Sequence, residues 1–398
     1  MKKLATLLIF LCVTIFAYPN DGVFYAAGNH LVPIAETDIC VQKEVLTLKR
    51  VGNHIEVTVY YEFFNPTKEK DLLVGFEAES PYNSYPIGVN YYHPHMRNFT
   101  VTLNGKTLPY EVAHSISRFD ESQNKYVVNY ENGKIPDLTW RQCEDSILAY
   151  DGEGYPYEFV YHFNAHFQKG LNIVQHTYQY DLSFSIGEEF YFPYVLTAAN
   201  RWANHQIDDF TLHVDMGDCE SFWIDTTFYK DMNEWTCDGV FRKAVYPYGE
   251  TMPIYHIQKG VLTFHKENFH PDGELYIKKP NIWLNDPYYN DGKPEPKKED
   301  KLLDCVKRLY FCFDKPSLPS DGDLFDVEAQ YMDASFTDEQ RRILRNLPFA
   351  YRGYVFKDKM LQQFYDSTDW YMPDPNYKTI DLNTLTERER KWVKHWNQ

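Results

Sequence analysis

The chain has 398 residues, of which 43% are hydrophobic and 24% are charged. These ordinary globular proportions exclude wholesale disorder, a collagen-like chain and a polytopic membrane protein, and the length suits two or three domains. A net charge of −17 disfavours binding to nucleic acids and to anionic lipid headgroups. Aromatic residues make up 17% of the chain, including 33 Tyr and 27 Phe, and this excess favours β structure.

The N-terminus has the pattern of a signal peptide. Lys2 and Lys3 precede an apolar run at 4–17, which is shorter than the ~20 residues that a membrane-spanning helix needs. We therefore expect a signal peptide at 1–17, cleaved after Ala17, and an exported protein with no transmembrane span in the mature chain. Its expected location is periplasmic or extracellular. A lipid anchor at Cys12 is less expected, because bulky residues at 9–11 precede it.

Cleavage would remove Cys12 and leave six cysteines, an even number that favours disulfides outside the cytosol. Loop closure favours near neighbours among the 15 possible pairings. The expected disulfide cysteines are therefore Cys219 with Cys237, Cys305 with Cys312, and Cys40 with Cys143. A continuous helix over 302–313 would separate Cys305 from Cys312 by ~10 Å, too far for a bond. Buried free thiols are the alternative.

Alternation of apolar and polar residues predicts the first strands. At 46–63 this alternation is interrupted by Gly52-Asn53, which predicts a β-hairpin, and 98–108 repeats the pattern around Asn104-Gly105. Further strands are expected at 157–163, 170–180, 210–214, 239–245 and 261–265. Short strands without repeating helices predict a mainly β fold, with an antiparallel β-sandwich region over 18–278 that forms two packed sandwiches. Residues 31–34 and the paired strands after them are loosely similar to uncharacterised exported bacterial β domains.

A linker and a helical module are expected after the strands. The segment 279–330 begins with a stretch rich in Pro, Asp and Asn and continues with a short Cys-containing segment of helical spacing. Thr337 and Gln340 form a capping box that starts a helix, which Pro348 is expected to end or kink. A second box at Thr386 and Glu389 starts a terminal helix, with Trp392, Val393 and Trp396 on one face.

The residues of this C-terminal part resemble a known family. Arg345, Asn346, Ala350, Gly353, Tyr354 and Phe356 are spaced as in the YARHG domain of exported bacterial proteins, over about 335–398. Phe349, Tyr351 and Arg352 stand where that family has Tyr, Arg and His. The resemblance implies an extracytoplasmic accessory module, here 331–398, with no established catalysis.

Two interpretations of the module's aromatic residues are open. We expect Trp370 to be buried against Phe356 and the face of the terminal helix, and Tyr351 and Arg352 to lie at the surface. The functional alternative is a candidate ligand surface formed by Tyr351, Arg352 and Tyr354.

No motif identifies an enzyme. The common serine-hydrolase, zinc-protease and nucleotide-binding patterns are missing from the sequence, and C-x-x-C does not occur. Two histidine pairs occur, His93 with His95 and His162 with His166. Their spacing along a strand does not suit the binding of one metal ion. We therefore predict no cofactor and no metal, and the sequence names no catalytic residue.

Tyrosines next to Pro and Asn form the remaining signal. Loop aromatics can stack on sugars or peptides, although pinning the loops to the sandwich is the simpler explanation. These residues are Tyr82, Tyr85, Tyr91, Tyr92, Tyr155, Tyr157, Tyr246, Tyr248, Tyr288 and Tyr289.

The leading hypothesis is an exported bacterial cell-envelope protein with a non-catalytic role, whose β region binds a glycan, a peptide or an envelope protein. The alternative is a hydrolase of an envelope polymer, with catalytic residues in the β region.

Overall fold

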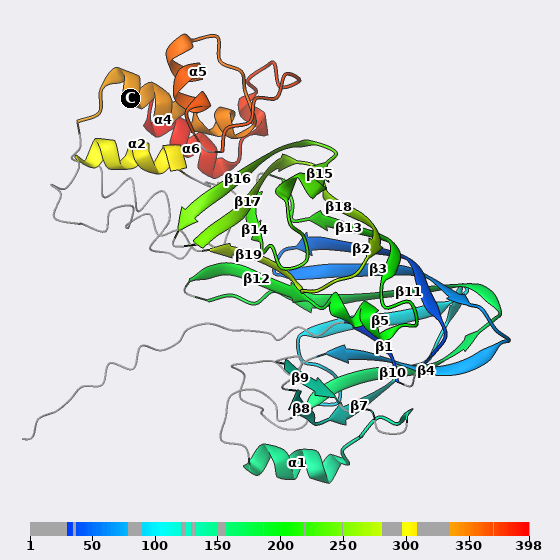
Figure 1. Ribbon diagram of the computed structural model, residues 1–398. Coiled ribbons are helices and arrows are strands. Elements are labelled where there is room, and N and C mark those ends of the chain that lie inside the picture. Colours follow the sequence, from blue (N-terminus) through cyan, green and yellow to red (C-terminus); the bar gives the residue numbers. More distant parts are fainter. Residues whose placement is uncertain are drawn as a thin grey trace, which may run out of the picture.

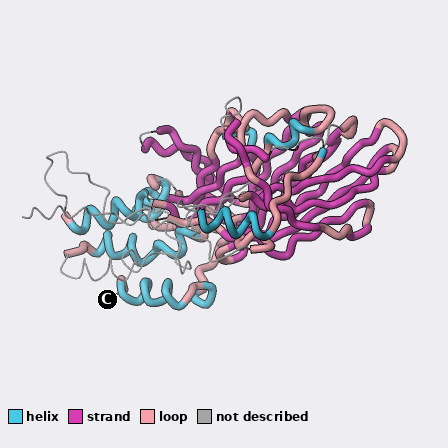
Figure 2. The backbone as a smooth tube through the Cα atoms, turned by 90° about the horizontal axis from the view of Figure 1, so that it is seen from below, coloured by secondary structure: helices cyan, strands magenta, loops and turns pink. Residues whose placement is uncertain are grey.

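The computed structural model shows a long β region with a helical module at its C-terminal end (Figures 1 and 2). It describes residues 30–34, 37–78, 90–120, 125–128, 130, 133–149, 157–185, 187–218, 220–248, 250–280, 297–308, 335–368 and 370–397. The expected signal peptide, most of the expected linker, Cys219 and Cys312 lie outside these residues.

The largest sheet has eight strands in the order β15-β18-β13-β2-β3-β11-β5-β6. All neighbouring pairs are antiparallel except β2 and β13, which run parallel. The strands are β2 (Cys40–Val51), β3 (His54–Asn65), β5 (Met96–Leu103), β6 (Lys106–Thr107), β11 (Gly170–Asp181), β13 (Ile207–Asp215), β15 (Trp235–Cys237) and β18 (Leu262–Phe269).

Both predicted hairpins of this sheet are confirmed. The turn between β2 and β3 places Gly52 at a φ of 59°, in the left-handed region that glycine adopts without steric cost. Asn104 and Gly105 have φ values of 50° and 76° between β5 and β6, as an Asn-Gly hairpin turn requires.

Two smaller sheets and one short ribbon complete the β region. The four-stranded sheet, in the order β1-β4-β10-β7, contains β1 (His30–Pro33), β4 (Lys70–Ala78), β7 (Glu111–Ser115) and β10 (Glu158–Phe167). The five-stranded sheet, in the order β12-β19-β14-β17-β16, contains β12 (Glu188–Tyr194), β14 (Glu220–Ile224), β16 (Val240–Tyr248), β17 (Glu250–Lys259) and β19 (Leu275–Pro280). The ribbon pairs β8 (Ser117–Asp120) with β9 (Lys125–Val128), and helix α1 (Trp140–Ala149) follows.

Both smaller sheets share one hydrophobic core with the eight-stranded sheet. On β3 the buried residues alternate with half-buried ones, so one face of the large sheet supplies this core. Phe76 of β4 packs against Phe99 of β5 at 4.9 Å between ring centroids. Trp235 of β15 packs against Tyr255 of β17 at 5.6 Å. The fold is therefore mainly β, as predicted, and its two sandwiches share the large sheet.

The C-terminal module consists of helices around an aromatic core. They are α2 (Lys298–Arg308), α4 (Asp338–Tyr351), α5 (Lys359–Asp366) and α6 (Glu387–His395), with short 3-10 turns elsewhere. Both predicted capping boxes are present, at Thr337 and at Thr386. Pro348 lies inside α4 and does not end it, because the helix continues to Tyr351.

Helix α2 belongs to this core although it lies in the segment expected to be a linker. Leu302 and Val306 are buried in the same cluster as Trp370 and Trp392. The indole Nε1–H of Trp370 donates a hydrogen bond to the carbonyl of Val306 at 2.7 Å. Trp370 is buried, as expected, and its ring stacks on Tyr351. No helix in the described ranges is long and apolar enough to cross a membrane.

Candidate functional site

The module sits against the five-stranded sheet near β16 and β17 (Figure 1). Arg242 of β16 donates a hydrogen bond from Nη1 to the carbonyl of Thr368 at 2.9 Å. Lys259 of β17 forms an ion pair with Asp374, with 2.5 Å between Nζ and Oδ2. We call this contact the junction.

Gly353 lets the backbones approach closely at the junction. Its φ is 75°, and a Cβ atom there would lie 2.5 Å from the Met372 carbonyl oxygen and 2.6 Å from Nε2 of Gln258. Any larger residue would strain the turn and collide with both neighbours. Gly353 therefore permits both the turn after α4 and the close contact with β17.

A cavity of about 20 Å³ lies within the junction, large enough for a single water molecule. The sheet contributes Ser221, His256 and Lys279 to its lining, and the module contributes Tyr351 and Trp370. The two rings from the module stack, with centroids 4.5 Å apart and an angle of 13° between their planes.

A serine and a histidine are hydrogen-bonded beside this cavity. Ser221 Oγ and His256 Nδ1 are 2.8 Å apart. Burial, followed by the nearby Arg242 charge, lowers the pKa of His256 to about 3. The imidazole is therefore neutral and a weak base at neutral pH, unlike a general base, which works best with a pKa near the operating pH.

Two carboxylates and two cations are buried next to this pair. Lys279 Nζ lies 2.9 Å from Glu220 and 2.8 Å from Glu189. Arg50 Nη1 lies 3.0 Å from Glu220, and its guanidinium group covers the ring of Phe190 at 4.3 Å. The formal charges cancel, and the group ties β2, β12, β14 and β19 together. Its arrangement is structural, since every charge has an opposite partner.

The three residues of the expected ligand surface point to different places. Tyr351 lines the junction cavity. Arg352 forms two hydrogen bonds to the Glu389 carboxylate, at 2.6 and 2.8 Å. Tyr354 packs edge-on against Phe356 at 5.1 Å. All three are half-buried, so the expected surface placement of Tyr351 and Arg352 is wrong: Tyr351 shares the junction cavity with residues of the five-stranded sheet, and Glu389 of α6 binds Arg352.

The expected disulfides are not formed among the described cysteines. Cys40, Cys143 and Cys237 are free thiols, so the expected pair of Cys40 with Cys143 is not present, while Cys219, the expected partner of Cys237, lies outside the described residues. Cys143 lies on α1 and Cys40 begins β2, which places the two on separate elements. Burial raises the pKa of Cys143 to about 11, so this thiol is protonated and unreactive at neutral pH.

Strand β7 and helix α1 lie at the end of the molecule away from the module (Figure 1), and a second region near them contains exposed aromatic side chains. Tyr91, Tyr92 and Trp140 are 46%, 53% and 46% exposed. His114 of β7, which is buried, lies between two of them, 6.2 Å from Tyr91 and 6.0 Å from Trp140 by ring centroids. We call Tyr91, Tyr92, Tyr110 and Trp140 the aromatic surface.

Tyr110 joins this surface from the segment before β7. Burial, followed by the charges of Tyr92 and Tyr91, raises the pKa of Tyr110. Tyr92 and Tyr110 both pack on the ring of Tyr161, with Tyr92 at 6.4 Å between centroids. The Tyr110 ring packs on Phe99 at 5.0 Å and on Tyr161 at 5.7 Å. The core therefore fixes the inner edge of the aromatic surface.

The backbone under the aromatic surface is held by local hydrogen bonds. His114 Nε2 lies 2.8 Å from the carbonyl of Asn90, and the His114 backbone N–H donates to Asp137 Oδ1 at 3.0 Å. The Leu138 N–H donates to the His114 carbonyl at 2.8 Å. Residues 136–138 thus cover the outer edge of β7 and hold Trp140 next to it.

The aromatic surface contains two of the loop tyrosines noted in the sequence, Tyr91 and Tyr92. Tyr157 packs into the core instead, and the side chains of the other noted tyrosines lie outside the described set. Trp140, Tyr110 and His114 had no signal in the sequence, because only the fold brings them together.

The described residues contain no group of three or more His, Cys, Asp or Glu side chains placed to hold a metal ion. His93 and His95 are 5.9 Å apart by ring centroids, and His95 lies 3.5 Å from Asp181. His166 lies 2.9 Å from Asp71 at the surface.

Comparison with known proteins identifies the C-terminal part. Residues 326–398 match the YARHG domain. The YARHG domain therefore includes α4, α5 and α6, while α2 precedes the matched residues and packs into the same core. A crystal structure from Legionella pneumophila, of a candidate nutrient-binding protein, aligns with a TM-score of 0.46 and 15% identity, over 95% of this chain and 99% of that one. No curated protein matches the chain.

Proposed function

We propose that this chain is an exported bacterial cell-envelope protein that binds a neutral glycan at the aromatic surface and does not catalyse a reaction. The YARHG domain is an accessory unit docked on the five-stranded sheet. The observation that carries this proposal is the exposure of three neighbouring aromatic rings, two of which flank one buried imidazole. Exposed apolar patches of this kind mark interaction sites on soluble proteins.

The chemistry of the aromatic surface favours a sugar over a peptide. Sugar rings present C–H faces that pack on aromatic rings, and tyrosine and tryptophan hold such contacts at little entropy cost. A peptide would bind most readily by adding a strand to a free sheet edge. At β7 that edge is covered, because the Leu138 N–H and the Pro136 carbonyl already bond to His114 and Ser115.

Charge restricts the glycan to a neutral one. The protein carries a net charge of −17, which repels polyanionic polymers over the range of the Debye length. Two carboxylates also lie at this end of the molecule: Glu111 begins β7, and Asp137 accepts a hydrogen bond from the His114 backbone.

Export is supported by the signal-peptide pattern at 1–17 and by the C-terminal resemblance to a domain of exported bacterial proteins. A periplasmic or extracellular location is part of this proposal. The cytosol offers no envelope polymer for the aromatic surface to bind.

A hydrolase is the weaker candidate. The hydrogen-bonded pair of Ser221 and His256 is the arrangement that would support it. However, the burial of His256 makes it a weak base, and the adjoining cavity is large enough for only one water molecule and is lined by Tyr351 and Trp370. A substrate has no room there while the domain is docked.

The test is a binding screen of the full mature chain against neutral oligosaccharides and soluble peptidoglycan fragments, with product analysis for turnover. We expect saturable binding without turnover. Trp140→Ala and Tyr92→Ala should each weaken it about tenfold or more, equivalent to ~1.4 kcal/mol. Phe184→Ala is the matched control, because Phe184 is 48% exposed but lies in the segment before β12. Turnover of any of these ligands by the wild type that is lost in Ser221→Ala would favour the hydrolase instead.

A further inference from the structure

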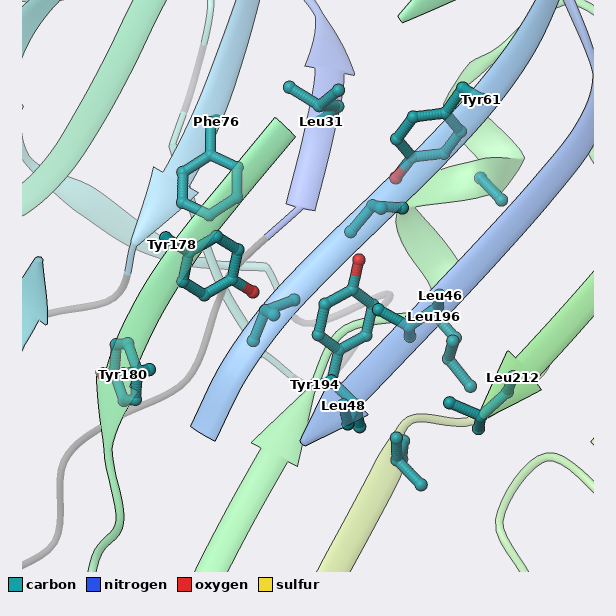
Figure 3. Close-up of a cluster of buried hydrophobic side chains, with 14 of the residues drawn as sticks. Leu31, Leu46, Leu48, Tyr61, Phe76, Tyr178, Tyr180, Tyr194, Leu196 and Leu212 are labelled. Atoms are coloured by element: carbon teal, nitrogen blue, oxygen red, sulfur yellow. The ribbon is translucent and has the colours of Figure 1, made fainter. Parts of the chain in front are cut away.

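A second cavity lies inside the sandwich, between β2, β3, β12 and the 3-10 helix Thr197–Arg201. Its volume is about 10 Å³, and its lining includes Leu31, Glu44, Tyr61, Tyr194, Leu196 and Trp202. Figure 3 shows the hydroxyl groups of Tyr61 and Tyr194 pointing toward one another, with Leu31 and Leu196 nearby. Glu44 is the one carboxylate among the described residues that line it.

Glu44 is an unusual residue for this position. It lies on the core face of β2, directly opposite Tyr61 of β3, and only 4% of it is exposed. Burial raises its pKa to about 8, and a hydrogen bond with Tyr61 opposes that rise. Among the residues that the structure describes, no cationic side chain contributes to this pKa. A buried carboxylate without a cation is costly, so the site favours either a proton or a bound cation.

The surrounding groups match one kind of cation. Ammonium groups are recognised by a carboxylate together with the faces of tyrosine and tryptophan rings. Trp202 is fully buried, and Phe63 holds its ring at 4.4 Å between centroids. Burial raises the pKa of Tyr61 and of Tyr194 well above the usual value, so both hydroxyls stay neutral and can accept hydrogen bonds. Glu44 is therefore the group that supplies charge.

We propose that this cavity binds a free ammonium ion against the Glu44 carboxylate. The volume sets the size limit. A cavity of about 10 Å³ accepts a particle about as large as one water molecule, which suits an ammonium ion and excludes a quaternary ammonium.

The first experiment measures thermal unfolding of the full chain at about pH 8 in chloride salts of equal ionic strength. Relative to sodium chloride, about 0.1 M ammonium chloride should raise the midpoint by about 2 °C or more. Tetramethylammonium should have no such effect. Methylammonium, whose methyl group exceeds this volume, should also have no such effect, and stabilisation by it would contradict the size limit.

The matched variants are Glu44→Gln and Glu62→Gln. Glu62 lies on β3 next to Tyr61 and faces the opposite side of the sheet. The ammonium effect should disappear in Glu44→Gln and persist in Glu62→Gln. Equal stabilisation by ammonium and tetramethylammonium would overturn the proposal. An ammonium effect that persists in Glu44→Gln would overturn it as well.

A wild-type measurement covers the case in which Glu44→Gln does not fold. Because the carboxyl must lose its proton before it pairs with an ammonium group, the ammonium effect should grow as the pH rises from 6 to 8. An ammonium effect that is constant over this range would contradict a role for Glu44.

Discussion

At the scale of single residues, Arg352 is the clearest case in which the structure changes an expectation. It was expected at the surface, but its guanidinium group binds Glu389 with two hydrogen bonds and also donates to the Pro348 carbonyl at 2.8 Å. Glu389 is 3% exposed. Arg352→Ala should therefore lower the unfolding free energy of the YARHG domain by ~1 to 3 kcal/mol, because hydrogen bonds to a buried charge are lost.

Chemical denaturation of the full chain, followed by a signal from α6, measures this effect. Arg345→Ala is the control, since Arg345 makes an exposed hydrogen bond to Asn397 and should cost well under ~1 kcal/mol. Equal losses for the two variants would contradict the structural role of Arg352.

His176 provides a pH-dependent prediction. It is fully buried between Tyr61, Phe76 and Tyr178, and burial lowers its pKa from 6.5 to about 3. Between these values the unfolded chain binds a proton that the folded chain does not, so stability falls as the pH drops. The slope is at most ~1.4 kcal/mol per pH unit. His176→Leu should remove this contribution and flatten the loss of stability between pH 6.5 and pH 4.

Urea unfolding at several pH values checks this slope. His265→Leu serves as the control, because the His265 side chain is 54% exposed and lies next to Asp209 at the surface. The account of His176 is wrong if its variant and the wild type lose stability in parallel.

At the scale of elements, α2 is expected to stabilise the YARHG domain although it precedes the residues that match the family. Val306 is fully buried and its carbonyl accepts the Trp370 hydrogen bond. Val306→Ala should cost ~2 kcal/mol and Trp370→Ala ~3 to 5 kcal/mol, as expected for buried side chains of these sizes. Hydrogen–deuterium exchange of α4 and α6 should rise in both variants. Unchanged exchange in Val306→Ala would mean that α2 is only peripheral.

The sequence predicts those elements whose local signals agree with the fold. The β2–β3 hairpin was predictable because one face of β3 is buried and Gly52 supplies the turn. Strand β4 was not predictable from the sequence. Its residues Leu72, Val74, Gly75 and Phe76 are all buried, and this interrupts the alternation of buried and exposed positions. Capping boxes located α4 and α6. The shared central sheet required contacts such as Phe76 with Phe99, which are far apart in the sequence.

The candidate sites were less predictable than the fold. Tyr91 and Tyr92 stood out as loop aromatics, but Trp140 joins them only because residues 136–138 fold along β7. Glu44 looks like an ordinary polar residue of a half-buried strand. A bulge between Val41 and Lys43 shifts the alternation of β2 and turns Glu44 inward.

At the scale of the whole molecule, the junction determines whether the YARHG domain and the β region move together. Gly353→Ala should weaken this contact, because the new Cβ would lie 2.6 Å from Gln258 Nε2 and 2.7 Å from the Asp374 backbone nitrogen. We expect faster hydrogen exchange in β17 and at 370–377, and a larger radius of gyration in small-angle scattering. Gly52→Ala is the control, since Gly52 also has a positive φ but has nothing within 4 Å of a new Cβ. Equal effects would show that backbone strain alone is responsible.

The central claim is that the aromatic surface, and not the junction, is the binding site. The most direct measurement is hydrogen–deuterium exchange of the full chain, with and without a saturating neutral oligosaccharide selected in the binding screen. The account predicts protection at 90–95 and 111–115 and around the start of α1, with no change at β14, β17 or 370–377. Protection confined to the junction around Ser221 and His256 would contradict it.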